Sequence, residues 1–278
     1  MLATAGCGAS HRVGGKTGPK PHPTPRAGYP VGVVGPLALD VQGVSARYGR
    51  LEQVASDPLV LVDARVATSA QVADTARANP VSEFAIVGAS ARAEHVPNLA
   101  GIVLKESDAA YLAGVTAGLV ASRAGGGERV AWVGPEERPL AASFTRGVRA
   151  AARGVTVLRQ WTRDVPASCK EAALTAIDRG AVVVMAHRGL CAAAAADAAH
   201  EQNLPALRLN DFLLPSVAAA VVAREASGGV FHGGQDVVFG TDSGAVGVRT
   251  LDPRVSLSIA AEVRAAAQRF AGTSGQGG

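Results

Sequence analysis

Residues 14–17 read Gly-Gly-Lys-Thr, which is the end of the loop that holds nucleotide phosphates in many proteins. The full loop has the pattern Gly-x-x-x-x-Gly-Lys-[Ser/Thr] and lies between a strand and a helix. Ser10 stands where the first glycine belongs, no apolar run precedes the segment, and the prolines from Pro19 to Pro25 exclude a helix after it. The segment therefore does not predict phosphate binding.

Patterns for enzymatic chemistry are also missing. The sequence has no His-Glu-x-x-His and no Cys-x-x-Cys pair, and Gly-Ala-Ser-Ala at residues 88–91 lacks the second glycine of a nucleophile elbow. His187 and His200 have no carboxylate and nucleophile at an evident spacing, and scattered histidines are more often surface residues. We therefore expect a protein that is not an enzyme and that has no cofactor and no metal site.

Cys7 follows a run of small residues that resembles the end of a bacterial lipoprotein signal. Thr4 stands where Leu is usual, and a full signal also needs a basic region and an apolar region of about 7 to 15 residues. We expect that the sequence begins inside its signal, that Cys7 carries a lipid, and that residues 8–28 form a disordered tether rich in Gly and Pro. The alternative is an ordinary disordered N-terminus with an incidental cysteine.

Composition indicates a compact protein of two lobes, because 278 residues exceed the usual single core of about 100 to 200 residues. The chain is 48% hydrophobic and 18% charged, and its net charge is only +4. This charge argues against nucleic acid as the main partner but is compatible with a weak attraction to anionic lipid. No apolar run reaches about 18 residues, so no membrane-spanning segment is predicted.

From Tyr29 onward, short apolar runs alternate with Ala-rich helical stretches, which is typical of βαβ units and a mostly parallel sheet. The first series has predicted strands at residues 31–34, 59–62, 84–87 and 101–104 and predicted helices at residues 44–55, 69–78 and 109–124. The second series has predicted strands at residues 129–133, 156–160, 181–186 and 206–209 and predicted helices at residues 140–152, 168–179, 192–202 and 216–226.

Three consecutive glycines, at residues 125–127, separate the two series. We therefore predict an α/β fold of two Rossmann-like lobes with parallel sheets around a hinge and a ligand cleft. The expected first lobe is residues 29–125 with residues 228–270 returning to it, the expected second lobe is residues 126–227, and residues 271–278 are an expected disordered tail.

Several segments resemble the basic membrane protein family of ABC-transporter solute-binding lipoproteins. Residues 98–118 contain the Tyr-Leu-Ala-Gly core of that family, and further matches follow in the family's order over residues 127–134, 144–150, 228–234 and 239–247. The resemblance covers about residues 29–270. It implies a type I periplasmic-binding-protein fold, a lipid anchor on the outer face of the cell membrane, ABC permease subunits as partners, and a small-molecule ligand, typically a purine nucleoside. We expect a monomer.

The sequence Tyr-Leu-Ala-Gly-Val-Thr-Ala-Gly-Leu at residues 111–119 has a second, purely structural interpretation. Its apolar residues share one face of a helix, and Gly114 and Gly118 allow another helix to approach closely. We therefore predict that this stretch is core and not ligand site.

Ligand contacts are expected in loops that follow strand ends, because open α/β sheets place their crevice there. Carboxylate and amide groups in these loops can accept hydrogen bonds from sugar hydroxyls, and aromatic rings can stack on a flat base. The predicted ligand-binding residues are Asp40, Gln42, Trp161, His187, Asn210, Asp211, Phe212 and Asp242. The alternative for each is a solvated loop residue or a turn former.

Three departures from the family pattern leave the ligand open. Residues 36–42 lack the family's Asp-rich, Phe-Asn-containing loop, Asp242 replaces a ligand-facing Lys, and Asn210 stands where Asp is typical. A reversed charge changes which ligand is tolerated. A ligand-sensing or interaction lipoprotein that has lost transport is therefore the second hypothesis.

Cys169 and Cys191 are expected to form a disulfide. Both lie at the starts of predicted helices that follow strand ends, so both are placed on the same rim of the second lobe. An exported protein permits the two thiols to pair. The alternative is two unrelated buried thiols.

Overall fold

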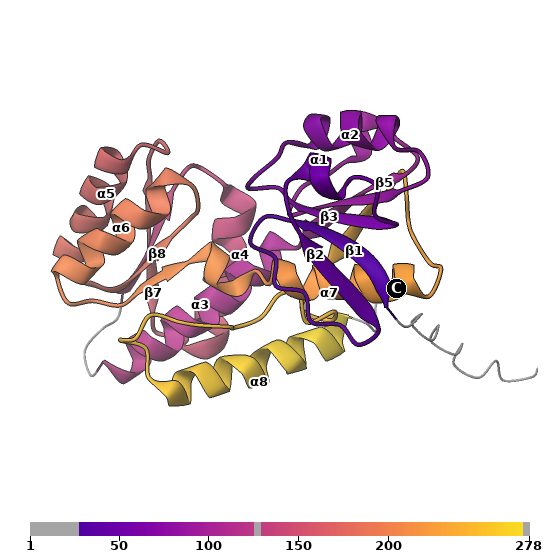
Figure 1. The fold of residues 1–278 in the computed structure, drawn as a ribbon. Coiled ribbons are helices and arrows are strands. Elements are labelled where there is room, and N and C mark those ends of the chain that lie inside the picture. The colour runs from indigo at the N-terminus through magenta and orange to yellow at the C-terminus, as the bar shows by residue number, and fades with distance from the viewer. Residues whose placement is uncertain (1–27, 125–128, 275–278) are drawn as a thin grey trace, which may run out of the picture.

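The computed structural model describes residues 28–124 and 129–274 of the chain. Two sheets, each with all its strands parallel, form two lobes that lie side by side (Figure 1). The first sheet has the order β10-β5-β4-β3-β1-β2. Its strands are β1 (Tyr29–Val34), β2 (Val44–Tyr48), β3 (Leu59–Asp63), β4 (Glu83–Val87), β5 (Leu99–Leu104) and β10 (Asp236–Phe239). The predicted α/β fold with two parallel sheets is confirmed.

The second sheet has the order β7-β6-β8-β9. Its strands are β6 (Arg129–Gly134), β7 (Thr156–Trp161), β8 (Ala181–Ala186) and β9 (Ala206–Arg208). Helices α5 (Pro166–Asp178) and α6 (Leu190–Glu201) cover one face with a core made largely of alanines. Helix α4 (Arg138–Ala151) packs on the other face, where Phe144 contacts Trp132 at a ring-centroid distance of 5.5 Å.

The first sheet is also covered on both faces. Helices α1 (Leu51–Val54) and α2 (Ser69–Ala78) and the 3-10 turn η1 (Arg92–Glu94) lie on one side, and α7 (Pro215–Ser227) lies on the other. Helix α2 begins where the sequence predicts it, because Thr68 and Gln71 form a reciprocal capping box at its start. The strands between these layers are buried on both faces and are therefore rich in Val, Ile and Leu.

The predicted helix at residues 44–55 is wrong. The chain forms β2 there, parallel to β1, and only the short α1 follows it. Val44 and Ala46 pack on the core, whereas Ser45 and Arg47 point to the opposite face. This alternation has the period of a strand, and a five-residue strand is too short to be separated from a helix by periodicity alone.

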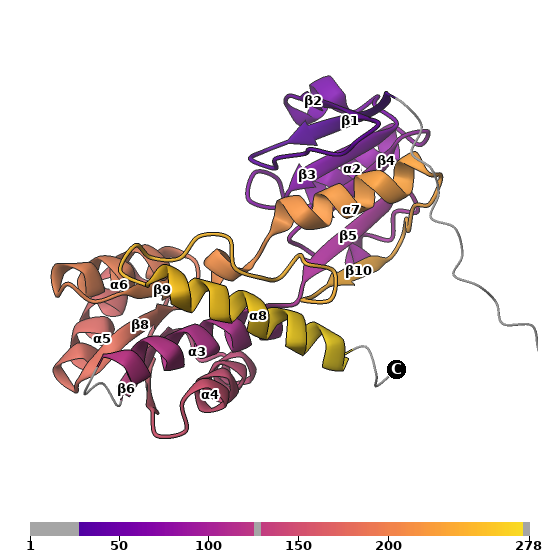
Figure 2. The ribbon, with the colours of Figure 1, turned by 90° about the horizontal axis from the view of Figure 1, so that it is seen from below.

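Two helices pack in lobes other than those expected. Helix α3 (Glu106–Arg123) follows β5, but its buried side chains join the cluster of the second lobe that contains Trp132. Helix α7 follows the second sheet, but its Ala218 and Val222 join the core of the first. The C-terminal helix α8 (Leu257–Ser274) lies alongside α3 in the second lobe (Figure 2), so only β10 of residues 228–270 joins the first sheet.

The chain passes between the lobes three times, and the three passages are hydrogen-bonded to one another. Lys105 N donates to Phe239 O at 2.8 Å, so the passage from β5 to α3 lies beside the end of β10. The third passage runs from β10 to α8. Leu214 N donates to Ala245 O at 2.8 Å, so the passage into α7 lies beside this third passage. These three passages of the chain form the hinge. The 3-10 turn η2 (Leu209–Phe212) precedes the second passage.

Three expectations concern residues outside the described ranges. Cys7 and the tether to residue 27 belong to them, and so does the glycine segment at residues 125–127, which connects α3 to β6. Of the expected disordered tail, residues 271–274 are the end of α8, and residues 275–278 lie outside the described ranges. Within residues 28–124 and 129–274, no helix combines the length and apolar character needed to cross a membrane.

Candidate ligand-binding site between the two sheets

The carboxyl ends of the two sheets meet at the hinge. β5 ends there and continues into α3, while the second sheet ends at η2 and returns through Leu213 to α7. A cavity of about 350 Å³ lies at this junction. Its lining comes from the ends of β4, β5 and β10 and from the hinge, namely Gly88, Val103, Leu104, Lys105, Glu106, Leu213 and Val238. Its walls are therefore apolar with two charged side chains at the hinge.

Arg188 connects this junction to the second lobe. It follows β8, and its guanidinium forms an ion pair with Glu106, the first residue of α3. A second guanidinium nitrogen lies 3.6 Å from Glu137, which follows β6. Two carboxylates thus share one cation, which leaves a surplus of negative charge.

His187 lies beneath this ion-pair group. The side chain is only 2% exposed, and its ring contacts Trp132 at a centroid distance of 5.8 Å. Nε2 lies 3.3 Å from a Glu137 oxygen without a well-directed hydrogen bond, and no other residue that the structure describes bonds to it. A buried ring nitrogen without a partner is costly, and a polar ligand could satisfy it.

Burial changes the proton affinity of two groups here. Burial lowers the pKa of His187, more than the nearby Glu137 raises it, which favours the neutral ring. Burial raises the pKa of Glu106, with Glu137 adding to the effect and Arg188 opposing it. The arrangement offers a neutral ring nitrogen, a guanidinium and two carboxylates, which suits hydrogen bonding to a polar molecule.

The hinge itself carries a buried acid. Asp108 is 4% exposed, and its carboxylate lies 3.2 Å from Lys105 Nζ. The backbone and hydroxyl of Thr241 also donate to it, each at 3.4 Å. These contacts tie the start of α3 to the segment after β10 and fix the direction in which Lys105 leaves the hinge.

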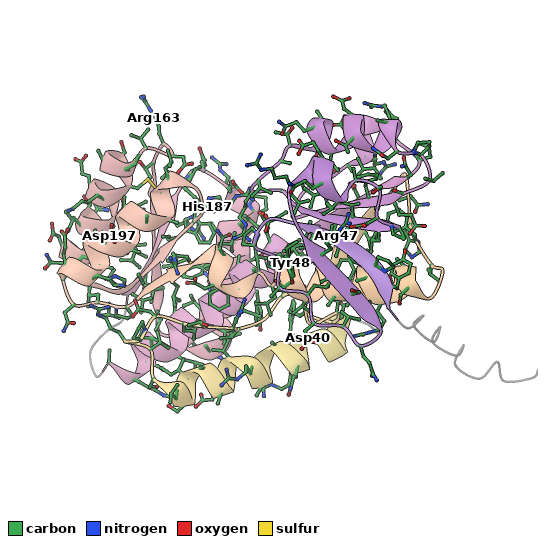
Figure 3. The ribbon with its side chains drawn as sticks, viewed as in Figure 1. Asp40, Arg47, Tyr48, Arg163, His187 and Asp197 are labelled. Carbon is green, nitrogen blue, oxygen red and sulfur yellow. A yellow bond between two sulfur atoms is a disulfide. The ribbon has the colours of Figure 1, made fainter. Side chains whose placement is uncertain are left out.

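Four of the predicted site residues lie near strand ends around the junction. His187 is described above, and Figure 3 shows it within the second lobe. Leu209 N donates to His187 O at 3.3 Å, which places Asn210 and Asp211 of η2 close to it. Asp211 is engaged by Arg208 at 3.0 Å. Asp242 follows β10 and accepts a hydrogen bond from Ser243 N.

The other predicted site residues are placed differently. Phe212 is fully buried in the core of the second lobe, so its ring has no free face for stacking. Trp161 ends the edge strand β7 and is 39% exposed. Gln42 precedes Gly43, whose carbonyl accepts from Tyr29 N at the start of β1, so Gln42 lies at the amino end of the sheet. Asp40 is exposed on the same returning loop (Figure 3).

The charged residues of the junction were not singled out from the sequence. Glu137 and Arg188 lie in loops that the sequence identified, but loops contain many charged residues that are solvated. Glu106 lies in the segment that carries the family resemblance, before the stretch interpreted as core. The only signal was position, because each of the three lies two or three residues after the end of a strand.

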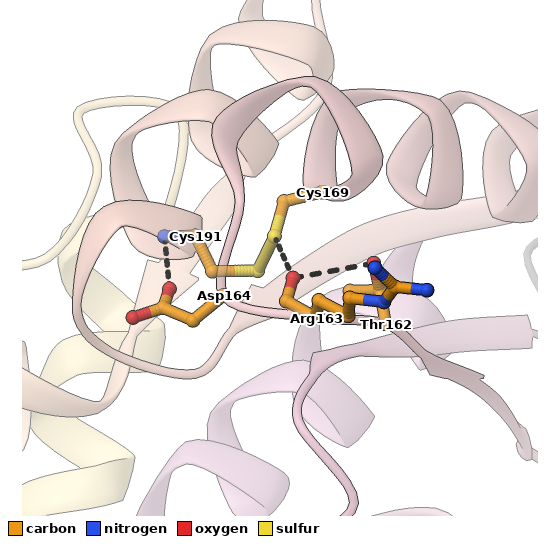
Figure 4. The surroundings of a disulfide bond; sticks show 5 residues. All are labelled: Thr162, Arg163, Asp164, Cys169 and Cys191. Atoms are coloured by element: carbon orange, nitrogen blue, oxygen red, sulfur yellow. Dashed lines mark hydrogen bonds between the residues drawn. A yellow bond between two sulfur atoms is a disulfide. The ribbon is translucent and has the colours of Figure 1, made fainter.

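A disulfide joins Cys169 and Cys191 at the rim of the second lobe, as the sequence predicts (Figure 4). The two Cα atoms are 5.2 Å apart, and both residues are fully buried. Asp164 lies nearby and accepts a hydrogen bond from Cys191 N at 2.7 Å. The disulfide and this hydrogen bond both fix Cys191 at the start of α6. Cys191 lies three residues beyond Arg188. Sulfur atoms joined in a disulfide do not offer thiolates to a metal.

Comparison with solved structures agrees with this architecture. The chain is similar to an ABC transporter system solute-binding protein from Conexibacter woesei DSM 14684, with a TM-score of 0.63 and 17% identity over 88% of this chain and 97% of that one. A second such protein, from Aeropyrum pernix K1, has a TM-score of 0.54 and 18% identity over 88% and 92%. A transcriptional activator of the comK gene from Bacillus halodurans has a TM-score of 0.59 and 12% identity over 89% and 99%. At such identities the likeness shows the fold.

No curated protein matches the sequence. A protein family does match it, the ABC transporter substrate-binding proteins described as PnrA-like, over residues 49–210. The matched region contains β3 to β9, and with them Glu106, Glu137, His187 and Arg188. Because it spans more than half of the sequence, the chain belongs to this family of substrate-binding proteins, called Bmp.

Proposed function

We propose that this protein binds a small polar solute between its two lobes and delivers it to the permease of an ABC transporter. The observation that carries the proposal is the junction of the two sheets, where a cavity of about 350 Å³ adjoins Glu106 and its ion pair with Arg188. Ligands of open α/β sheets bind at the carboxyl ends of strands. Membership of a substrate-binding family supports the same conclusion.

The ligand contributes the contacts that hold the lobes together in this proposal. His187 Nε2 makes no hydrogen bond to the described residues, Glu137 lies 3.3 Å from it, and the Arg188 guanidinium can turn from Glu106 toward a ligand group. The three hinge passages let the lobes approach, because each passage is a few residues of backbone. A ligand that contacts both lobes binds the closed form more tightly than the open form and therefore shifts the population toward the closed form.

The chemistry of the junction bears on the ligand class. A purine nucleoside would need aromatic faces for its base, and Phe212 is buried while Trp161 lies at the end of the edge strand. Beside the largely apolar cavity, the groups available to a ligand are the charged Glu106 and Arg188 and the ring nitrogen of His187. A compact polar solute therefore fits the junction better than a nucleoside does, and nucleosides remain one class to be tested.

We further propose that the protein acts outside the cytoplasm, held by a lipid on Cys7, as a monomer that meets its permease at the membrane surface. Family membership supports the extracytoplasmic position, and the sequence around Cys7 supports the anchor. Metabolic lipid labelling of the protein expressed from its natural gene start should mark it, and Cys7→Ala should release it from the membrane. Absence of label on such protein would refute the anchor.

Thermal unfolding in the presence of nucleosides, sugars, amino acids and other small polar solutes tests the binding role. A solute at about 100 times its Kd should stabilise the folded protein by about 2.7 kcal/mol and raise its Tm by roughly 5 to 10 °C. Glu137→Gln should weaken this effect, whereas Glu171→Gln, an exposed change on α5, should leave it intact. Failure of every solute would favour the alternative of an interaction protein that has lost transport.

A further inference from the structure

A second charged region lies on the second lobe, away from the junction. The sequence from residue 138 to residue 163 contains arginines at positions 138, 146, 149, 153, 159 and 163 and no Asp or Glu. This segment forms α4 and β7, so its arginines are carried by two adjacent elements. A run of one sign over that length concentrates positive charge on one side of the lobe.

Three of these arginines converge on a groove. Arg149 and Arg153 come from the end of α4 and the turn after it, and Arg159 comes from β7. The groove has a volume of about 460 Å³, and Thr145 and Thr156 complete its polar lining. Because β7 is the edge strand of its sheet, nothing from the sheet covers its outer side.

Hydrogen bonds through Thr145 fix the position of one groove arginine, Arg159. Thr145 is 8% exposed, and its hydroxyl donates to Ala141 O at 2.7 Å. The same hydroxyl oxygen accepts a hydrogen bond from Arg159 Nη2 at 3.2 Å. A guanidinium with one nitrogen fixed in this way has fewer orientations to lose, which lowers the entropy cost of binding a ligand.

Within the described residues, no carboxylate pairs with the three groove arginines. Other arginines of the chain have such partners: Arg138 pairs with Glu136, and Arg123 pairs with Glu262. Arg146, one turn before Arg149 on α4, donates to Ser143 Oγ and also lacks an acid. Like charges one turn apart on a helix, such as Arg146 and Arg149, repel one another, so an anion bound beside them would stabilise this face.

The groove is separate from the junction. It lies at the start of β7, because Thr156 is the first residue of that strand, whereas the junction lies at the carboxyl ends of the strands. The two sites are therefore at opposite ends of the second sheet. A ligand of the groove does not compete with a solute at the junction.

We propose that this groove binds a phosphate group. Guanidinium groups match phosphate oxygens in geometry, can bind them through two parallel hydrogen bonds, and remain charged at all relevant pH values. The phosphate can belong to a small molecule in solution or to the headgroup of an anionic phospholipid. In the second case the groove turns this side of the lobe toward the membrane surface.

The test compares a groove variant with a variant of equal charge. The groove variant carries Arg149→Gln, Arg153→Gln and Arg159→Gln. The matched control carries Arg92→Gln, Arg224→Gln and Arg249→Gln, which are exposed and lie outside α4 and β7. Both variants lose the same net charge, so an effect confined to the groove variant cannot come from net charge alone.

Two arms distinguish the sources of the phosphate. Titration with inorganic pyrophosphate at constant ionic strength should show binding by the wild type and by the control variant. The groove variant should bind pyrophosphate about 100-fold more weakly, because each charge-assisted hydrogen bond contributes about tenfold or more in affinity. Flotation with phosphatidylglycerol vesicles, compared with phosphatidylcholine vesicles, tests the headgroup, and here too the groove variant should lose about 100-fold in binding.

Groove-dependent binding in either arm supports the proposal and identifies the source. Absence of binding in both arms overturns it, and so does an equal loss in the matched control. Binding of duplex DNA alone, with the same dependence on the three arginines, would also overturn it in favour of a nucleic-acid surface. Solute binding at the junction should be unchanged in the groove variant.

Discussion

Replacing Gly114 by Ala should separate α3 from α4 and destabilise the second lobe. A Cβ atom at position 114 would lie 2.0 Å from Phe144 O and 3.0 Å from Val148 N. Both are backbone atoms of α4, so no rotation of a side chain can relieve the overlap, and the helices must move apart by about 1 Å or more. Ala gains about 1 kcal/mol over Gly as a helix former, whereas overpacking costs about 1 to 3 kcal/mol and more against backbone.

The expected net effect of Gly114→Ala is a loss of about 2 kcal/mol in the free energy of unfolding and a Tm lower by roughly 4 to 8 °C. Urea unfolding followed by circular dichroism measures it. Gly118→Ala should have a smaller effect, because its Cβ would lie 2.9 Å from Val148 O. Gly272→Ala, in α8 with no atom within 4 Å of the added Cβ, is the control and should not destabilise. A variant at position 114 as stable as that control would refute the reasoning.

Three further predictions concern covalent and ionisable groups. Reducing the Cys169–Cys191 disulfide, whose cysteines are 22 residues apart, should lower the free energy of unfolding by about 3 kcal/mol in urea titrations with and without dithiothreitol. Burial lowers the pKa of His187 below its unfolded value of about 6.5. The contribution of His187 to the free energy of unfolding should therefore be complete above that unfolded pKa and decrease as the pH falls from it toward the folded pKa. His187→Gln should remove this pH dependence. Burial raises the pKa of Asp252, but hydrogen bonds from Ala206 N, Arg254 N and His200 outweigh it and lower the pKa. Its contribution to stability is therefore full above about pH 4 and lost as pH falls through the folded pKa, and Asp252→Asn should remove that acid-dependent loss.

Each of these predictions has its own control. Dithiothreitol should not affect a variant with Ala at both cysteine positions, and a similar loss there would show that the reagent acts elsewhere. An unchanged pH slope in His187→Gln would assign the slope to another group. For Asp252, His200→Gln removes only one of three hydrogen bonds and should change the acid response less than Asp252→Asn does.

Local pattern was sufficient for most elements of the fold. The helix at residues 69–78 was predicted with its observed bounds, and the structure shows a capping box at its start. Residues 44–48 were mistaken for helix, because in so short a segment the strand alternation resembles part of a helical pattern. Helices and strands are therefore recovered where length or capping adds to periodicity.

The candidate site was recovered only in part. The sequence identified the loops that follow strand ends, and His187, Asn210 and Asp211 lie together there. It could not show that Phe212 turns into the core, since an aromatic residue after a strand fits a core and a site equally well. Direction of a side chain in a loop depends on what packs around the loop.

The sequence by itself determined the family, the two parallel sheets and the pair of cysteines that forms the disulfide. These follow from motifs, from periodicities of 2 and 3.6 residues, and from position along the chain, all of which are local properties. Only the tertiary structure decided that α3 and α7 pack in opposite lobes, that Glu106 and Arg188 meet across 82 residues of sequence, and that Arg149, Arg153 and Arg159 share one groove. The reason is physical: these contacts arise where the chain passes three times through one hinge and where an edge strand lies beside a helix, and no local pattern records which distant segments come together.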